Sequence, residues 1–193
     1  NNQSEHHLLQ IAADQFWLLR EIPQYRSHAI ALHKKLLELL EDKSHTREQS
    51  VVLERLCALE PDSLAYFSDL LAHELNTQHV LSSQIFDRAL GYIRKITIQD
   101  EIAASICLNL ITSAYRRGEK QWLGELENRF NLLVPSDAEE LMFRAKFTDV
   151  YWKANLRDDD GRKLTVHALQ DLASQIDSSK SPQLRSLKGE ILN

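Results

Sequence analysis

Residues 101–117 read EIAASICLNLITSAYRR, and this stretch decides the fold of the chain. It is followed by EKQWLGELENRFNLL at 119–133 and by DAEELMFRAKFTDVYWKAN at 137–155. The three stretches predict three consecutive helices. The first is apolar almost all round and rich in small residues, which is typical of a buried central helix. One polar side chain, Asn109, lies in its middle. We expect the rest of the chain to pack on either side of these three helices.

The segments outside this trio are also helical in pattern. Their apolar residues recur at spacings of three and four, the signature of amphipathic helices. These helices are expected at about 5–20, 24–41, 47–59, 63–76 and 81–96, and at about 164–176 and 184–191. No segment has the alternation of a strand, and the chain has only 5 Gly and 4 Pro. Both observations predict an all-α fold.

The helices recur with a regular period. Those expected to start near residues 24, 63, 99 and 137 are separated by about 39, 36 and 38 residues. A helical hairpin repeated at roughly 34 to 47 residues is typical of solenoids of paired helices. The tetratricopeptide consensus residues are absent, so the likeness is one of architecture. We therefore expect one helical-repeat domain over residues 1–193, built as a right-handed, tetratricopeptide-like superhelix of antiparallel helix pairs. The first helix of each pair would line a concave groove suited to peptides.

Composition excludes several classes of protein. The net charge is −5, which argues against a large nucleic-acid interface on this chain, because phosphate binding needs a basic face. Cys57 and Cys107 lie in apolar helical contexts and predict free, buried thiols in a reducing, cytoplasmic setting. No window reaches the roughly 18 apolar residues of a membrane span, so no membrane partner is expected.

The sequence carries no motif for catalysis, a cofactor or a metal. His73, Glu74 and His79 superficially suggest a zinc helix, but the two histidines are six residues apart and a helix end intervenes. The acidic run 158–160 lacks the ligand spacing of a calcium loop and is better placed to cap the following helix. We therefore expect no enzyme activity, no cofactor and no metal site.

Asn109 is the leading candidate for a ligand contact. A buried amide must be hydrogen-bonded, either to another helix or to something bound, and an amide matches a peptide unit because it both donates and accepts. Arg144, Tyr151 and Trp152 are candidates to border the same groove. The alternatives are core packing for the two aromatic residues and an ion pair with Glu140 for Arg144.

The region 85–192 resembles the C-terminal regulatory domain of the Rgg family of Gram-positive transcription regulators. The resemblance is carried by ICLNLI (106–111), FRAKFTDVYWK (143–153) and DGRKLTVHALQDLASQI (160–176), with LCALEPD (56–62) similar to a preceding stretch. It implies a homodimeric helical-repeat domain that binds a short signalling peptide on its concave face, as in quorum sensing. It also implies an N-terminal helix-turn-helix domain that contacts DNA. That domain is absent here, and the chain starts without Met, so we expect it upstream.

We interpret the chain as the peptide-binding and dimerisation part of a cytoplasmic transcription regulator. The alternative is a helical-repeat scaffold for protein–protein interaction without a small ligand. The C-terminal helix bears on the position of a dimer surface, because Leu184, Leu187 and Ile191 on it require an apolar partner.

Overall fold

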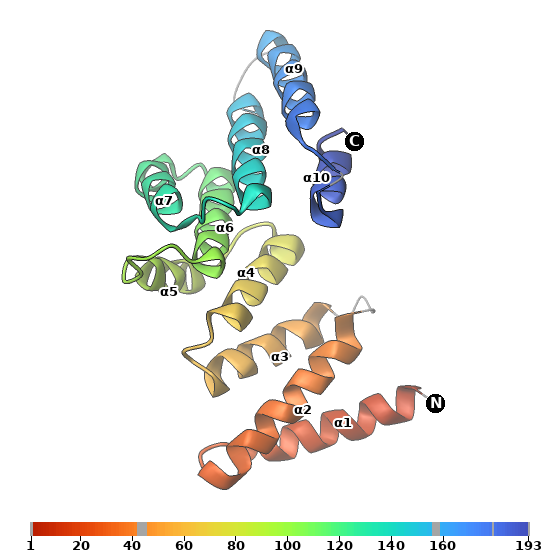
Figure 1. The fold of residues 1–193 in the computed structure, drawn as a ribbon. Coiled ribbons are helices and arrows are strands. Elements are labelled where there is room, and N and C mark those ends of the chain that lie inside the picture. The colour runs from red at the N-terminus through yellow and green to blue at the C-terminus, as the bar shows by residue number, and fades with distance from the viewer. Residues whose placement is uncertain (1, 42–45, 156–158, 179, 193) are drawn as a thin grey trace. The chain divides into compact units, whose positions relative to one another are not determined.

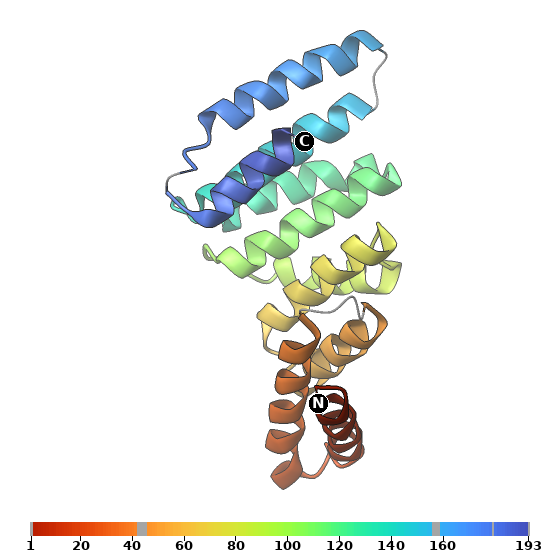
Figure 2. The same ribbon diagram turned by 90° about the vertical axis from the view of Figure 1, so that its right-hand side faces the viewer.

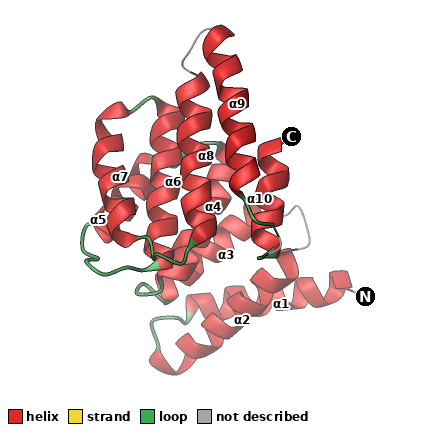
Figure 3. Cartoon of the chain, turned by 45° about the horizontal axis from the view of Figure 1, so that its top comes forward, coloured by secondary structure: helices red, strands yellow, loops and turns green. Residues whose placement is uncertain are grey.

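The computed structural model describes residues 2–41, 46–155, 159–178 and 180–192. These residues form helices joined by turns and loops, and they contain no strand (Figures 1 and 3). All the predicted helices are present. Their bounds are α1 (Asn2–Leu18), α2 (Pro23–Glu41), α3 (Thr46–Leu59), α4 (Leu64–Gln78), α5 (Ser83–Ile93), α6 (Glu101–Arg117), α7 (Lys120–Leu133), α8 (Glu139–Asn155), α9 (Asp159–Gln175) and α10 (Pro182–Leu192). The all-α prediction is confirmed. The acidic cap expected at 158–160 depends on side chains outside the described residues.

The chain divides into two compact units, Asn1–Leu81 and Ser82–Asn193. In the first unit, α1 packs against α2, α2 against α3, and α3 against α4. Its main core cluster joins residues from three helices, namely Ala13, Leu36, Leu40, Val52 and Leu56. Two side chains close helix ends: Gln49 donates to the carbonyl of Leu40 at 2.6 Å, and Arg26 donates to that of Leu59. Such bonds satisfy carbonyl groups that a helix end leaves without partners.

A buried histidine lies inside the first unit. His33 is fully buried, and its Nδ1 lies 2.7 Å from the carbonyl oxygen of Ala29. Nδ1 is therefore the protonated nitrogen, and Nε2 faces the guanidinium of Arg55 at 3.4 Å. Arg55 in turn pairs with Asp14 at 2.5 Å. Burial is the main cause that lowers the pKa of His33, and the positive charge of Arg55 lowers it further.

The second unit is built on α6, which packs against α5, α7 and α8. Asp100 caps its N-terminus by accepting from the backbone N–H of Ala103 at 2.7 Å. Gly118 ends it with φ of 71°, a backbone conformation in which a residue with a Cβ is strained. The Cys107 thiol donates to the Leu126 carbonyl at 3.1 Å and so ties α6 to α7.

Helix α8 packs against α6 on one side and against α9 and α10 on the other (Figures 1 and 2). The side towards α9 and α10 belongs to a second core cluster, in which Phe143 and Phe147 pack against buried residues of both helices. Those buried residues are Leu172, Ala173, Ile176, Leu184, Leu187 and Ile191. The three C-terminal residues expected to require a partner therefore find it within their own chain. They do not provide an exposed apolar face for a dimer.

Candidate functional site

Helix α6 has a stripe of partly accessible side chains. Most of its side chains are buried, whereas Ser105, Asn109, Thr112 and Arg116 are half-buried. Spacings of four, three and four residues place these positions on one side of an α-helix. The central helix is therefore partly accessible along this stripe, although it is not sealed elsewhere, since Tyr115 and Arg117 are also half-buried and Ile102 is exposed.

Asn109 is half-buried, so the expectation of a fully buried amide was wrong. The reason is that Ser105, Thr112 and Arg116 lie on the same side of α6 as Asn109, and this side is not completely covered, since all of them are half-buried. Within the described part of the chain the Asn109 amide makes no hydrogen bond. Its neighbour Thr112 instead bonds back to the carbonyl of Leu108 at 3.0 Å. The donor and acceptor of Asn109 therefore remain available for another molecule.

Trp152 is the predicted site residue on α8 that contacts the accessible stripe. The guanidinium carbon of Arg116 lies 5.9 Å from its ring centre, within cation–π range. Tyr151 is 42% exposed and packs edge-on against Trp152, with ring centres 5.3 Å apart. It also lies against Phe147 at 5.6 Å. The two aromatic side chains thus continue from the end of the stripe towards the C-terminal core.

Arg144 is engaged in ion pairs. Its Nε donates to Glu140 at 2.9 Å, and its Nη1 lies 3.4 Å from Glu190 on α10. The first of these contacts is the pair considered as the alternative for this residue. The guanidinium therefore links α8 to α10 in this structure, and nothing brings it to Asn109.

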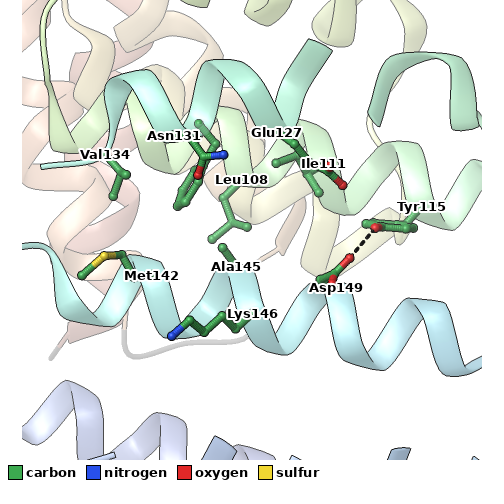
Figure 4. Close-up of a pocket in the computed structure, with 11 residues that line it drawn as sticks. Leu108, Ile111, Tyr115, Glu127, Asn131, Val134, Met142, Ala145, Lys146 and Asp149 are labelled. Carbon is green, nitrogen blue, oxygen red and sulfur yellow. Dashed lines mark hydrogen bonds between the residues drawn. The ribbon is translucent and has the colours of Figure 1, made fainter. Parts of the chain in front are cut away.

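A pocket of about 380 Å³ lies between α6, α7 and α8 (Figure 4). Helices α7 and α8 both pack on α6 but make few direct contacts with each other, which leaves the space open. Leu108 and Ile111 on α6 and Phe130 on α7 are almost fully buried and line it. Its other lining residues are Tyr115, Glu127, Asn131, Val134, Met142, Ala145, Lys146 and Asp149.

The pocket has an acidic end. The Tyr115 hydroxyl donates to the Asp149 carboxylate at 3.0 Å, joining α6 to α8 (Figure 4). Burial raises the pKa of Tyr115, and the neighbouring carboxylates of Asp149 and Glu127 raise it further. The phenol is therefore a hydrogen-bond donor at neutral pH, held between two negatively charged groups.

The pocket and the Asn109 stripe face different directions. Asn109 and Ile111 are two residues apart, which turns their side chains about 200° around the helix axis. None of the four predicted site residues lines the pocket. The pocket was not predictable from the sequence, because its lining residues come from three helices and which faces of those helices meet is not encoded locally. Within each helix the lining residues share one face: 108, 111 and 115 on α6, 127, 130, 131 and 134 on α7, and 142, 145, 146 and 149 on α8.

The described side chains offer no evident catalytic or metal centre. No group of three or more His, Cys, Asp or Glu is placed to hold a metal ion in the part of the chain that is described. Cys107 is a poor nucleophile, because burial raises its pKa to about 12. Helix α4 ends at Gln78, so His79 lies beyond the helix that carries His73.

Comparison of the chain with protein-family models, with curated proteins and with solved structures found no match. Among the described residues, no helix is both long enough and apolar enough to cross a membrane.

Proposed function

We propose that this chain is the peptide-binding regulatory part of a cytoplasmic transcription regulator with an Rgg-like organisation. The observation that supports the proposal most directly is Asn109, a half-buried amide without a hydrogen bond in the described chain, on a partly accessible side of a largely buried helix. An asparagine amide can accept from the N–H of a peptide unit and donate to its C=O at the same time.

The dimensions of the stripe suit a short extended peptide. Ser105 and Arg116 are eleven residues apart, which corresponds to roughly 16 Å along a helix. An extended chain advances about 3.3 Å per residue, so the stripe accommodates about five residues. Asn109 would hold one peptide unit, and the Arg116–Trp152 pair would border the end of the peptide.

The proposal also includes the finer architecture expected from the sequence. The helix pairs would form a right-handed, tetratricopeptide-like superhelix with the stripe of α6 on its concave face. Two copies would associate, and an upstream helix-turn-helix domain would contact DNA. Peptide binding would shift the populations of two conformations, to the extent that the peptide binds one of them more tightly.

The test begins with mass spectrometry of peptides that copurify with the full-length protein from its native host. The peptide identified is resynthesised, and its affinity is measured by calorimetry for the unsubstituted protein and for Asn109→Ala. Loss of two hydrogen bonds of about 1 kcal/mol each predicts a loss of affinity of tenfold or more. Stability should not fall, because Ala favours a helix more than Asn does.

The matched control is Asn128→Ala, which removes an exposed amide from α7, away from the stripe. It should leave peptide affinity unchanged. If Asn109→Ala lowers the unfolding temperature and leaves affinity intact, the amide has a structural role and the proposal is wrong.

A protein-interaction scaffold is the second candidate function, and one observation favours it. Helix α1 exposes apolar side chains along one side, with Leu8 66% exposed, Ile11 45% and Leu18 71%. Isolated exposed apolar residues are common, but a row of them along a helix is typical of a protein-binding surface. Under this alternative no peptide would copurify, and Leu8→Glu together with Leu18→Glu would abolish partner binding while Asn109→Ala would not.

A further inference from the structure

Four side chains from three helices of the first unit meet where α1 faces α2. Asp14 and Trp17 belong to α1, His33 to α2 and Arg55 to α3. The Arg55 Nη1 donates to the Asp14 carboxylate at 2.5 Å and to His33 Nε2 at 3.4 Å. The guanidinium carbon lies 5.2 Å from the ring centre of Trp17, and the Trp17 ring packs edge-on against His33 with ring centres 6.0 Å apart. Arg55 therefore ties α3 to both of the other helices at one point.

The contact between Arg55 and His33 exists only while the imidazole is neutral. His33 Nδ1 donates to the Ala29 carbonyl at 2.7 Å, so the lone pair is on Nε2, which accepts from Arg55. A protonated ring has an N–H at both nitrogens and would set a donor and a positive charge against the guanidinium. Because His33 is fully buried, water screens this repulsion only weakly.

Two charged groups act on the His33 ring, Asp14 from α1 and Arg55 from α3. Burial is the main cause that lowers the pKa of His33, the charge of Arg55 lowers it further, and the charge of Asp14 opposes both. Arg55 stays protonated in a protein, and so does Arg20, whose guanidinium carbon lies 4.2 Å from the Trp17 ring centre. His33 is therefore the group of this cluster whose charge changes near neutral pH.

The two halves of α1 are held to α3 by contacts that respond to acid in opposite ways. Helix α1 packs along α2 (Figures 1 and 2), and its C-terminal half reaches α3 through Arg55. Its N-terminal half reaches α3 through His6, whose Nε2 lies 3.6 Å from the Glu48 carboxylate. Protonation of His6 would add an attraction to Glu48, whereas protonation of His33 would remove the Arg55 contacts. An effect of His33 should therefore be confined to the C-terminal half of α1.

We propose that His33 is a pH-sensitive latch for α1: when its ring takes up a proton, Arg55 is expelled and the C-terminal half of α1 separates from α2 and α3. The Asp14 side chain is 46% exposed, so water replaces the guanidinium there, and separation also opens the His33 ring to water. The latch is closed above about pH 6.5, the ordinary pKa of histidine, and opens progressively below it, because the released state binds the proton more readily. This device does not depend on the peptide function proposed above.

The test is hydrogen exchange of the backbone amides of residues 10–18, measured by mass spectrometry and corrected for the intrinsic pH dependence of exchange. Uptake of one proton changes the opening equilibrium by at most about tenfold per pH unit. Exchange of these amides should therefore rise several-fold, and by no more than about tenfold, between pH 6.5 and 5.5. The amides of α4, in the same unit and the same sample, should change by less than about twofold.

Three variants separate the latch from a general effect of acid. His33→Gln keeps hydrogen-bonding groups but takes up no proton, so the rise should disappear. Arg55→Met removes the charge that a protonated ring repels, so exchange in residues 10–18 should already be faster at pH 7.5 and should rise little further in acid. His28→Gln is the matched control, because His28 is an exposed histidine of α2 that stacks on Phe16 of α1, and there the rise should remain.

The outcomes decide the inference in each case. It is overturned if exchange in residues 10–18 does not rise between pH 6.5 and 5.5, if α4 rises by the same factor, or if His33→Gln keeps the rise. Should His33→Gln fail to fold, Arg55→Met decides, and an acid-induced rise as large as that of the unsubstituted protein overturns the latch.

Discussion

Helix α6 can be tested through the reactivity of Cys107, whose thiol is fully buried against α7. Its pKa of about 12 leaves roughly one thiol in ten thousand ionised at pH 8. A free cysteine with a pKa near 8.5 is roughly one-quarter ionised at that pH, so ionisation alone should slow alkylation more than about a thousandfold. Steric burial slows it further, and we expect alkylation to proceed only when α6 and α7 separate.

The perturbation is Leu126→Ala, which removes a fully buried side chain beside Cys107. A buried Leu→Ala substitution costs about 2–5 kcal/mol. If this cost lowers the free energy of the opening that exposes the thiol, the alkylation rate should rise by about thirtyfold to several thousandfold. The matched control is Leu132→Ala on the same helix, where the side chain is 48% exposed and the rate should change by only a few fold.

The assay is timed alkylation with iodoacetamide, followed by mass spectrometry of the two cysteine-containing peptides. Cys57 lies in the first unit and is also buried, so it reports on opening elsewhere in the same sample. The reasoning is refuted if Cys107 of the unsubstituted protein reacts within about tenfold of its rate in denaturant. It is equally refuted if Leu126→Ala and Leu132→Ala have the same effect.

Three further predictions concern stability. The pKa of His33 is lowered in the folded state, so the unfolded chain takes up a proton at a higher pH than the folded chain does. The free energy of unfolding should therefore fall as pH drops below about 6.5, by at most about 1.4 kcal/mol per pH unit. Denaturant titrations at pH 7.5 and 5.5 measure this pH dependence, and His33→Gln should remove the part that comes from His33. Leu187→Ala, at a fully buried site, should destabilise the second unit by about 2–5 kcal/mol, and Leu192→Ala, at a 59% exposed site, should have little effect on the same unfolding curve. Gly118→Ala should lower the free energy of unfolding by about 1–2 kcal/mol, because Gly118 has a positive φ. Gly124→Ala inside α7 should raise it by up to about 1 kcal/mol. The melting temperatures of the two variants, measured by calorimetry, should therefore move in opposite directions.

The helices were predictable because their signals are local. Pro61 follows the end of α3 at Leu59, and Gly118 ends α6 with the backbone conformation that favours glycine. The apolar positions of α7 also behaved as their spacing predicts, since Leu126, Phe130 and Leu133 are all buried. Ser63 occupies the N-cap position of α4, although the adjacent Asp62 is also a residue type that favours this position. Helix ends are set by a few competing residues, so errors of one or two positions are expected.

The candidate site was harder to predict, because it depends on which helices meet. The sequence identifies Asn109 as the one polar side chain of an apolar stretch, but its accessibility depends on the packing around α6. Arg144 has one partner four residues away, which the sequence shows, and a second on α10, which it does not. The contact between Tyr115 and Asp149 joins residues 34 apart in sequence and carries no local signature.

The position of α8 between α6 and the C-terminal helices has a consequence for how the sequence can change over time. Most described side chains of α8 are half-buried, and few are fully exposed. A helix covered on one side has a free face where neutral substitutions accumulate, but α8 has almost none. Its neighbours α7 and α10 each have an exposed side that can vary. In related chains α8 should therefore evolve more slowly than either neighbour, even at positions that touch neither the pocket nor the Asn109 stripe.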